Sequence, residues 1–530
     1  MSAAVEKTAA LPEPLYCNPH GLYPFQAEGV ARAYLSESDD LVIWDTGTGK
    51  THFALALSAL LFEDDEIDHT VIVAEKNKVD EWVKDYRKFT AIEAGAYQGA
   101  PAKRERLRQS LPPVIISTYE TFRNDLAVLP KSKQAKPSPG PLLEHLKGQR
   151  TLIVYDEITK IKGRGSANHR AHAFFVKQMR EHARTRVVGL TATPIERDPE
   201  DFYNLGRIVC PEHMPTVAGF EADYILARDI YGRVRKWRNL TPEDAVGVTP
   251  FSALFEGIVQ RKRKSDPDVV AQFPQQVEEF SYVPLRGQQA EFYRAVRETF
   301  EGCSDDEERR LFTVMRQIAA HPASLTYSQG QMAQDIVAAT GAETLWQMGS
   351  AKVDRLLAYL EPLVKGQGAQ VVVFTFFAST VLPILHQALT DAGYSVAVNH
   401  GGVSNRDREA AKDAFQRGDV EVFLSSDAGS KGINLQAASY VVNFEVPLTY
   451  ANYVQRINRA HRIDSTHESV VCQSFIASHE RFRTIEESIA QMVLHRNQWS
   501  DDLLEDDDAG DDFISAADRK TMLSLAKQRQ

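Results

Sequence analysis

The segment from residue 41 to 60 constrains the fold more than any other part of this chain. It joins an apolar strand, LVIW (41–44), to a glycine-containing loop, DTGTGKT (45–51), and then to an apolar helix, HFALALSAL (52–60). A loop that runs from a strand into a helix N-terminus lies at the carboxyl edge of a parallel sheet, where backbone N–H groups bind anions. This order therefore predicts a parallel α/β domain with a phosphate-binding loop.

The residue types in the loop match the chemistry of a nucleoside triphosphate and its metal ion. Glycines let the backbone N–H groups approach the phosphates, Lys50 reaches the β and γ phosphates, and Thr51 can hold magnesium. Trp44 stands where the strict pattern has its first glycine, and the alternative is an ordinary glycine turn. By itself the loop indicates only a nucleoside triphosphatase. We expect the nucleotide to contact Thr46, Gly47, Thr48, Gly49, Lys50 and Thr51.

Two adjacent carboxylates follow another apolar strand. Asp156 and Glu157 come directly after TLIVY (151–155), and the end of a strand in the same parallel sheet lies beside the phosphate loop. Asp156 suits magnesium, and Glu157 suits the activation of a water molecule. Solvated strand ends also carry such acids, but the phosphate loop upstream favours the catalytic interpretation.

Apolar, β-branched segments alternate with helical patterns in two separate parts of the chain. The first set comprises 41–44, 70–74, 114–118, 151–157 and 186–193, and the second comprises 370–377, 394–398, 420–426, 439–445 and 469–476. This alternation is typical of parallel sheets, and 530 residues exceed the size of a single domain. We expect two α/β lobes at 20–210 and 350–498, helical protrusions and a linker at 211–349, and an acidic tail with a terminal helix at 499–530.

Polar residues recur at helical spacing in YVQRINRAHR (453–462). Gln455, Arg459 and Arg462 would share one face of a helix through this segment. Arginine suits the charge that develops on a transferring phosphoryl group, so these side chains are candidates to meet the γ phosphate from the second lobe. The alternative is an ordinary basic helix face in contact with water.

The net charge neither supports nor excludes a nucleic-acid partner. The chain carries −11, but residues 501–512 hold 8 of the acidic residues, which leaves 61 basic and 64 acidic residues elsewhere. A near-neutral body can carry a basic groove, and basic residues gather at 261–264 and around Trp237. The acidic tail is a candidate for binding a protein partner, and a solvated linker is the alternative.

Cysteine spacing and hydropathy exclude several classes of protein. The four cysteines lie far apart without C-x-x-C spacing, so neither structural zinc nor a disulfide framework is indicated. No apolar stretch approaches the roughly 20 residues of a membrane helix, and the first residues do not resemble a signal peptide. We expect no membrane partner and a cytoplasmic location, in a bacterial or virus-infected cell, or a nuclear location in a eukaryote.

In order and spacing, these segments resemble the SWI/SNF-like group of superfamily two helicase-related ATPases, over about residues 20–495. The resemblance implies two RecA-like lobes of the P-loop NTPase class. YDEITKIKG takes the place of the group's DEAH-type box, SSDAGSKGINLQAA resembles motif V, and QRINRAHRI resembles motif VI. VQRKRKSDPDVV, MRQIAAHPASL and GSAKVDRLLAYL resemble the group's linking segments between the lobes.

Further residues receive roles only through this resemblance. Gln26 in HGLYPFQAEGV would contact adenine, and Gly432 and Asn434 in motif V would contact the nucleotide. VDEWVKDYRKF and VIISTYETF resemble segments Ia and Ib, which hold the nucleic-acid backbone, while GLTATPIER resembles motif III and FTFFAST resembles motif IV. The implied nucleic-acid contacts are Thr118, Thr191, Thr193, Thr375 and Ser426.

Two departures from the group's pattern would weaken the coupling between ATP and nucleic acid. Thr159 stands where the group has histidine, and Asp464-Ser465 stand where Gly-Gln is usual. The two core acids and both candidate arginines are nevertheless present.

The resemblance implies an ATPase that uses ATP and Mg²⁺ to move along duplex DNA and to remodel DNA structures or protein–DNA complexes. A strand-separating helicase for DNA or RNA is the alternative enzyme. A nuclease-linked motor is disfavoured because the chain has no E-x-K tripeptide. A non-enzymatic clamp would leave the phosphate loop, both acids and both arginines unexplained. No segment resembles a chromatin reader, so we expect a compact viral or bacterial type.

Overall fold

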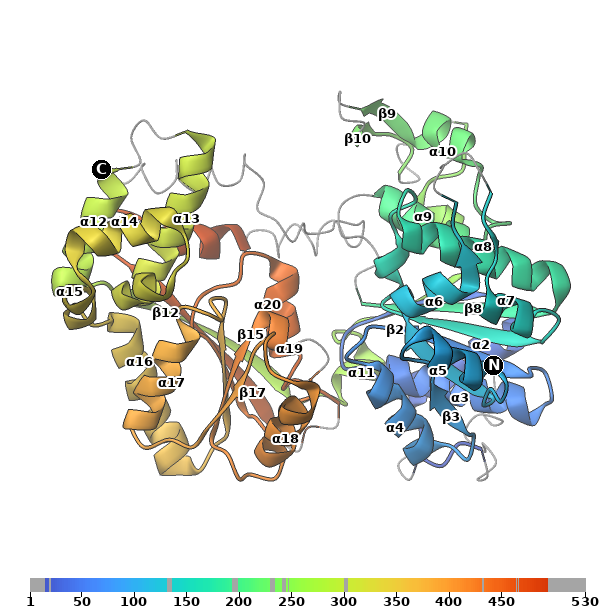
Figure 1. The fold of residues 1–530 in the computed structure, drawn as a ribbon, viewed down its shortest axis with the longest axis horizontal. Coiled ribbons are helices and arrows are strands. Elements are labelled where there is room, and N and C mark those ends of the chain that lie inside the picture. The colour runs from blue at the N-terminus through green and yellow to red at the C-terminus, as the bar shows by residue number, and fades with distance from the viewer. Residues whose placement is uncertain are drawn as a thin grey trace. The chain divides into compact units, whose positions relative to one another are not determined.

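The chain folds into two compact units, each with its own sheet and hydrophobic core (Figure 1). Among the described residues, the first unit extends to Ala271 and the second begins at Gln272. The computed structural model describes residues 15–18, 21–130, 136–192, 199–228, 234–240, 245, 247–299, 304–430, 433–463, 465 and 467–493.

The first unit is built on a seven-stranded sheet with the order β11-β1-β8-β7-β2-β4-β3, in which all paired neighbours run parallel. Its five inner strands are buried except at one end residue of β2, β7 and β8, which explains their continuous apolar sequences. The strands are β1 (Asp40–Trp44), β2 (His69–Ala74), β3 (Ala94–Ala96), β4 (Val114–Thr118), β7 (Thr151–Asp156), β8 (Thr185–Thr191) and β11 (Val259–Lys262).

Helices pack against this sheet in ways that their sequences explain. Helix α3 is apolar on all sides and is buried from Phe53 to Leu61. Helix α4 is amphipathic and buries only Val79, Trp82, Val83 and Tyr86, which share one face. The helices are α2 (Pro24–Ser36), α3 (Lys50–Glu63), α4 (Val79–Phe89), α5 (Pro101–Arg108), α6 (Tyr119–Leu126), α7 (Pro141–Leu146), α8 (Ala167–His182), α9 (Pro199–Val209), α10 (Val217–Tyr224) and α11 (Pro267–Val270).

The second unit is built on a six-stranded sheet with the order β12-β17-β16-β13-β15-β14, whose paired neighbours are also parallel. Successive residues of β13 enter different hydrophobic clusters: Val371 and Val373 pack in one, and Val372 and Phe374 pack in the other. Both faces of the sheet are therefore covered. The strands are β12 (Gln275–Pro284), β13 (Val371–Thr375), β14 (Val396–Asn399), β15 (Val422–Ser426), β16 (Tyr440–Asn443) and β17 (Ser469–Ser478).

Helices α12 to α15 gather at one end of the second unit, away from α18 (Figure 1). They pack in the same cluster as Val372 and Phe374, so they are part of the second core. The helices are α12 (Gly287–Glu298), α13 (Asp305–Ala320), α14 (Gln331–Thr340), α15 (Ala342–Gln347), α16 (Ala351–Leu360), α17 (Leu382–Asp391), α18 (Asn405–Gln416), α19 (Asp427–Ser430) and α20 (Tyr450–Ile457).

The predicted fold class is confirmed: two parallel α/β sheets form two separate lobes, and each predicted strand is present. The region predicted as mainly helical also contains four strands, β9 (Ile225–Arg228), β10 (Val234–Trp237), β11 and β12. Strand β11 lies at one edge of the seven-stranded sheet, and β12 lies at one edge of the six-stranded sheet. An edge strand is partly solvated and carries polar residues, so QQVEEFSYVP and VQRK lack the apolar signal of the inner strands.

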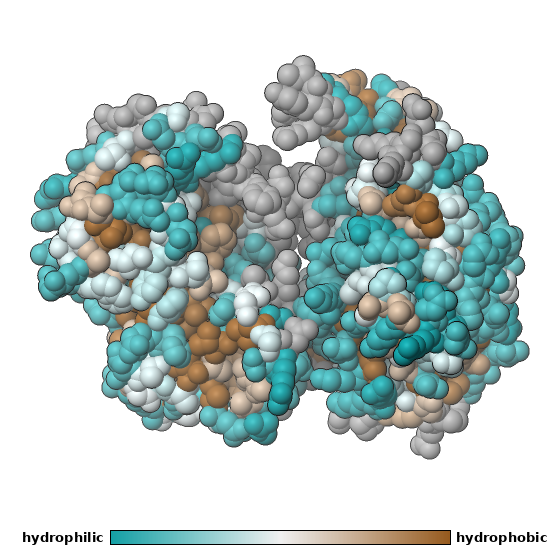
Figure 2. Space-filling view, viewed as in Figure 1, coloured by the Kyte–Doolittle hydropathy of each residue, from teal (hydrophilic) through white to brown (hydrophobic). Residues whose placement is uncertain are grey.

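Hydrophilic residues cover most of the face shown in Figure 2, with smaller hydrophobic areas on each unit. Within the described residues, no helix combines the length and the apolar character needed to cross a lipid bilayer.

Candidate functional site

The phosphate loop adopts the conformation that its glycines allow. Gly47 and Gly49 have φ angles of 91° and 89°, in the left-handed region that favours glycine. Gly49 is the N-cap of α3, and Thr48 is buried with its hydroxyl donating to the Asp45 carbonyl over 2.7 Å. The Lys50 amino group donates to the carbonyls of Trp44 and Asp45, over 2.7 and 3.2 Å. The loop therefore presents the start of α3 and the lysine at the carboxyl end of β1.

Gln26 holds this loop from helix α2. Its Nε2 donates to the Thr48 carbonyl over 2.8 Å, and its Oε1 accepts from the Tyr23 backbone N–H over 3.0 Å. A Cβ atom at Gly49 would displace the Gln26 amide from this position. The predicted adenine contact therefore lies directly against the phosphate loop.

The acid pair lies at the end of β7, two strands from β1. Asp156 Oδ2 accepts a hydrogen bond from the indole Nε1 of Trp82 over 2.8 Å. Glu157 has a φ of 56°, which is uncommon for a residue with a side chain. Its Oε2 accepts from the Thr191 hydroxyl over 3.4 Å, which brings the last residue of β8 to the same place.

Burial and charge determine the ionisation of this pair. Burial raises the pKa of both Asp156 and Glu157 above their ordinary values, and the positive charge of Lys50 opposes the rise in each case. Lys50 and the two acids are therefore parts of one electrostatic environment. The hydroxyl of Thr51 and the carboxylate of Asp156 offer the oxygen donors that Mg²⁺ prefers, so these residues fit that ion.

The structure corrects the helix predicted through 453–462. Helix α20 ends at Ile457, and Arg459 and Arg462 lie beyond its end, so helical periodicity does not place them on one face with Gln455. Tertiary hydrogen bonds hold the residues after the helix: the Arg459 carbonyl accepts from the Leu435 N–H over 2.8 Å, and the His461 ring contacts the Pro274 carbonyl over 2.8 Å. Arg459 is buried, whereas Gln455 and Arg462 are half-buried.

Arg456 received no role from the sequence, yet it is the centre of a buried network. Its guanidinium donates to both oxygens of Asp427, over 2.6 and 2.9 Å, and to Asn443 Oδ1 and the Glu445 carbonyl, over 3.1 and 2.9 Å. Its side chain is 1% exposed. Arg456 thus joins the segment that resembles motif VI to the one that resembles motif V. The partners come from distant parts of the chain, so no spacing rule indicates them.

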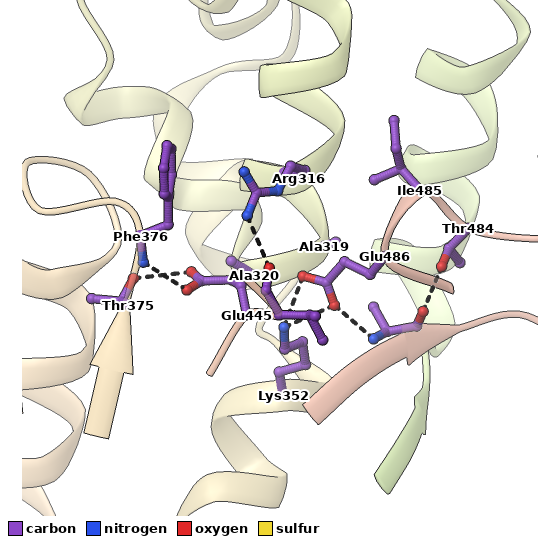
Figure 3. A network of polar contacts seen from close by, with 12 residues as sticks. Arg316, Ala319, Ala320, Lys352, Thr375, Phe376, Glu445, Thr484, Ile485 and Glu486 are labelled. Atoms are coloured by element: carbon purple, nitrogen blue, oxygen red, sulfur yellow. Dashed lines mark hydrogen bonds and ion pairs between the residues drawn. The ribbon is translucent and has the colours of Figure 1, made fainter. Parts of the chain in front are cut away.

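Figure 3 shows a further network of polar contacts, to which Thr375, Arg316 of α13 and Lys352 of α16 contribute. The Thr375 hydroxyl and the Phe376 N–H donate to the two oxygens of Glu445, over 3.0 and 3.1 Å. Arg316 of α13 donates to the Val446 carbonyl over 3.3 Å. Lys352 of α16 donates to both oxygens of Glu486 over 2.9 Å, with both side chains buried.

The four described residues with an implied nucleic-acid contact have one feature in common. Thr118, Thr191, Thr375 and Ser426 are the last residues of β4, β8, β13 and β15. Each therefore lies at the carboxyl edge of its sheet, but each side chain is buried. The Thr118 hydroxyl caps α6 by accepting from the Thr121 N–H, and Ser426 Oγ accepts from the Gly429 N–H.

The remaining predicted nucleotide and nucleic-acid contacts, and the basic segment 261–264, lie as follows. Asn434 is half-buried, and its Nδ2 donates to Gln436 Oε1 over 2.8 Å. Gly432 and Thr193 lie outside the described residues. The basic segment 261–264 begins within edge strand β11, and the Lys264 N–H donates to the Asp45 carboxylate at the start of the phosphate loop.

Two family models match this chain. The model of the SNF2-related domain matches residues 29–334, more than half of the 530. The chain belongs to the SNF2-related family. The model of the helicase conserved C-terminal domain matches residues 351–464, in the second unit. The predicted family and the predicted class of enzyme, a SNF2-family ATPase of helicase or translocase type, are both confirmed.

Individual relatives of this SNF2-related chain are distant in sequence. It is 25% identical over 505 residues to "Chromodomain-helicase-DNA-binding protein 1-like" of Danio rerio, a match that covers 92% of this chain and 44% of that protein. It is 21% identical over 515 residues to "Uncharacterized ATP-dependent helicase YqhH" of Bacillus subtilis, which covers 94% of this chain and 83% of that protein. The chain spans less than half the length of several curated eukaryotic relatives.

A solved structure shares the fold of this SNF2-related chain. The helicase domain of Hef from Pyrococcus furiosus is 15% identical, with a TM-score of 0.56, and the match covers 89% of this chain and 98% of that one. The likeness agrees with the two parallel-sheet lobes described above.

Proposed function

We propose that this chain is a motor that hydrolyses ATP to translocate along duplex DNA and thereby remodels DNA structures or protein–DNA complexes. One observation supports the ATPase part most strongly. Lys50 and the acids Asp156 and Glu157, which come from distant segments, share one electrostatic environment at the carboxyl edge of a single sheet. This is the combination of groups that phosphoryl transfer to water requires.

The residues of the first unit would divide the chemistry among them. The loop N–H groups and Lys50 bind the β and γ phosphates, and Gln26 contacts the adenine. Thr51 and Asp156 would hold Mg²⁺, which supplies positive charge to those phosphates. Glu157 accepts a proton from the attacking water, and its buried position keeps the carboxylate basic enough for that task.

The second unit would contribute positive charge to the transferring phosphoryl group through Arg459 and Arg462, with Gln455 orienting the attacking water. Gly432 and Asn434 would add contacts to the nucleotide. A guanidinium suits this task because it stays charged and donates several hydrogen bonds in one plane.

Duplex DNA is the proposed substrate of translocation because membership of the SNF2-related family favours it and a relative carries "DNA-binding" in its name. The strand ends at Thr118, Thr191, Thr375 and Ser426 would hold the loops that meet the phosphate backbone, since their own side chains are buried. Thr193, in the segment after β8, would join them. Backbone N–H groups are common phosphate ligands.

Steady-state ATP hydrolysis tests both the proposed ATPase activity and the kind of nucleic acid that stimulates it. Wild type, Lys50→Ala and Lys177→Ala are each assayed with no nucleic acid, duplex DNA, single-stranded DNA and duplex RNA. Lys177 is the matched control because its side chain is 72% exposed on α8. We expect duplex DNA to stimulate hydrolysis most, and only Lys50→Ala to abolish it. Absence of Lys50-dependent hydrolysis under every condition would refute the proposal.

Translocation needs its own measurement. On a long duplex that carries a third strand, a motor moving along the duplex displaces that strand in the presence of ATP, and Lys50→Ala does not. On a forked duplex we expect little strand separation. Efficient fork unwinding, or stimulation mainly by single strands or RNA, would instead support a strand-separating helicase.

A further inference from the structure

Tyr119 connects the segment that resembles Ib to the backbone of the catalytic acids. It is the first residue of α6 and directly follows Thr118 at the end of β4. Its hydroxyl donates to the Asp156 carbonyl over 2.8 Å and lies 3.1 Å from the Glu157 carbonyl. The two carbonyls belong to the peptide groups on either side of the Glu157 α-carbon, so one hydroxyl holds both.

Glu157 needs this support because its backbone conformation is strained. Its φ of 56° lies in the left-handed region, which a residue with a side chain adopts only when its surroundings hold it there. The direction of the Glu157 carboxylate depends on these backbone angles. A shift of the Tyr119 hydroxyl therefore changes the position of the proposed general base.

Tyr119 is itself fixed to the elements around it. The ring nitrogen Nε2 of His172, on α8, lies 3.2 Å from the Tyr119 carbonyl, and the two rings meet edge to face at 5.5 Å. The ring of Tyr155 stacks on Tyr119 at 6.2 Å. With a side chain that is 2% exposed, Tyr119 does not itself offer a surface to nucleic acid. Its contacts instead join α6 to α8 and to the end of β7.

We propose that Tyr119 is a positioning residue that transmits to Glu157 the displacement caused by nucleic-acid binding at segment 114–122. Tyr119 thereby makes ATP hydrolysis depend on bound nucleic acid. This inference rests on the proposed function. Nucleic acid held by the turn at Thr118 and α6 shifts the adjacent Tyr119 hydroxyl, and the two carbonyls follow it. The link lies wholly within the first unit.

Tyr155 provides a matched control for packing. It is fully buried, its ring lies in the same stack, and its hydroxyl has no hydrogen-bond partner among the described residues. Tyr119→Phe and Tyr155→Phe thus delete the same atom at neighbouring positions, and only the first removes the bonds to the acid backbone.

The experiment compares wild type and both variants for kcat and KM of ATP hydrolysis, without DNA and with saturating duplex DNA, and for duplex binding by fluorescence anisotropy. We expect Tyr119→Phe to lower the DNA-stimulated kcat about tenfold, because small displacements of a catalytic group have effects of that order. Its unstimulated kcat falls by a smaller factor than its stimulated kcat, while its KM for ATP and its DNA affinity stay within about twofold of wild type. Tyr155→Phe retains full stimulation.

Three results would overturn the inference. Tyr119→Phe with full stimulation shows that the hydroxyl transmits nothing. An equal loss of stimulated and unstimulated kcat shows that it only supports Glu157. Weakened DNA binding shows that it shapes the nucleic-acid surface instead. Failure of the proposed function is distinct, because it appears in the wild type as hydrolysis that duplex DNA does not stimulate.

Discussion

The indole N–H of Trp82 donates a hydrogen bond to Asp156 Oδ2 over 2.8 Å, which joins helix α4 to the end of β7. A partner that orients a metal-holding carboxylate typically changes metal affinity or activity by about 10- to 100-fold when it is removed. We therefore expect Trp82→Phe to raise the Mg²⁺ concentration for half-maximal ATP hydrolysis about tenfold. A magnesium titration at fixed ATP measures this value.

Trp44→Phe is the control for the volume that Trp82→Phe removes. Trp44 is fully buried, and its Nε1 has no hydrogen-bond partner among the described residues. Both variants lose core packing, so both should lower the melting temperature, but only Trp82→Phe should shift the magnesium titration. Equal titration midpoints for the two variants would show that the indole N–H does not orient Asp156.

The buried pair of Lys352 and Glu486 predicts an asymmetric response to mutation. Removal of one partner from a buried ion pair leaves an uncompensated charge and costs about 3–5 kcal/mol. We expect Lys352→Met to lower the free energy of unfolding by this amount. Adding Glu486→Gln should recover most of the loss, because a neutral amide oxygen can still accept from the Ala477 N–H.

Urea unfolding of the single and double variants checks this prediction. Lys177→Met is the control, because Lys177 forms an exposed pair with Glu181, with side chains 72% and 47% exposed. Its effect should stay below about 1 kcal/mol. A double variant as unstable as Lys352→Met would mean that packing, and not charge, accounts for the loss.

Arg456→Lys should disrupt the link between the segments that resemble motifs V and VI. A lysine cannot donate in parallel to both oxygens of Asp427 and also reach Asn443 and the Glu445 carbonyl. We expect a loss of about 2–4 kcal/mol of stability. Differential scanning calorimetry measures it. Arg417→Lys, at an exposed pair with Asp419, should change little. Equal melting temperatures for the two variants would contradict the prediction.

His172 predicts how stability depends on pH. Burial lowers its pKa to about 4, from an ordinary value of 6.5. Between these values the unfolded chain binds more protons than the folded chain, so the free energy of unfolding decreases as the pH falls through this window. We expect His172→Gln to reduce this dependence by about one proton. Unfolding curves from pH 4.5 to 7 test it, and parallel pH dependences for both proteins would show that His172 does not contribute.

Local sequence was sufficient to predict the parts of the fold that depend on neighbouring residues. An apolar strand, a glycine loop and an apolar helix follow one another in 41–60, so the phosphate loop and Lys50 could be located without coordinates. The inner strands are buried on both faces, and their unbroken apolar sequences predicted two parallel sheets. The roles of individual site residues in catalysis and nucleic-acid binding stay predictions.

Features that depend on residues far apart in the chain needed the tertiary structure. The sequence predicted that a helix continues to Arg462, but α20 ends at Ile457, and the residues after it are bonded to Leu435 and Pro274. The polar strands β11 and β12 became visible only through pairing with β1 and β17. Sequence alone thus determined the phosphate loop and the inner strands, because periodicity and glycine geometry act locally. Only the tertiary structure decided that the Trp82 indole and the Tyr119 hydroxyl hold the acid pair, because such bonds form where folding brings distant segments together.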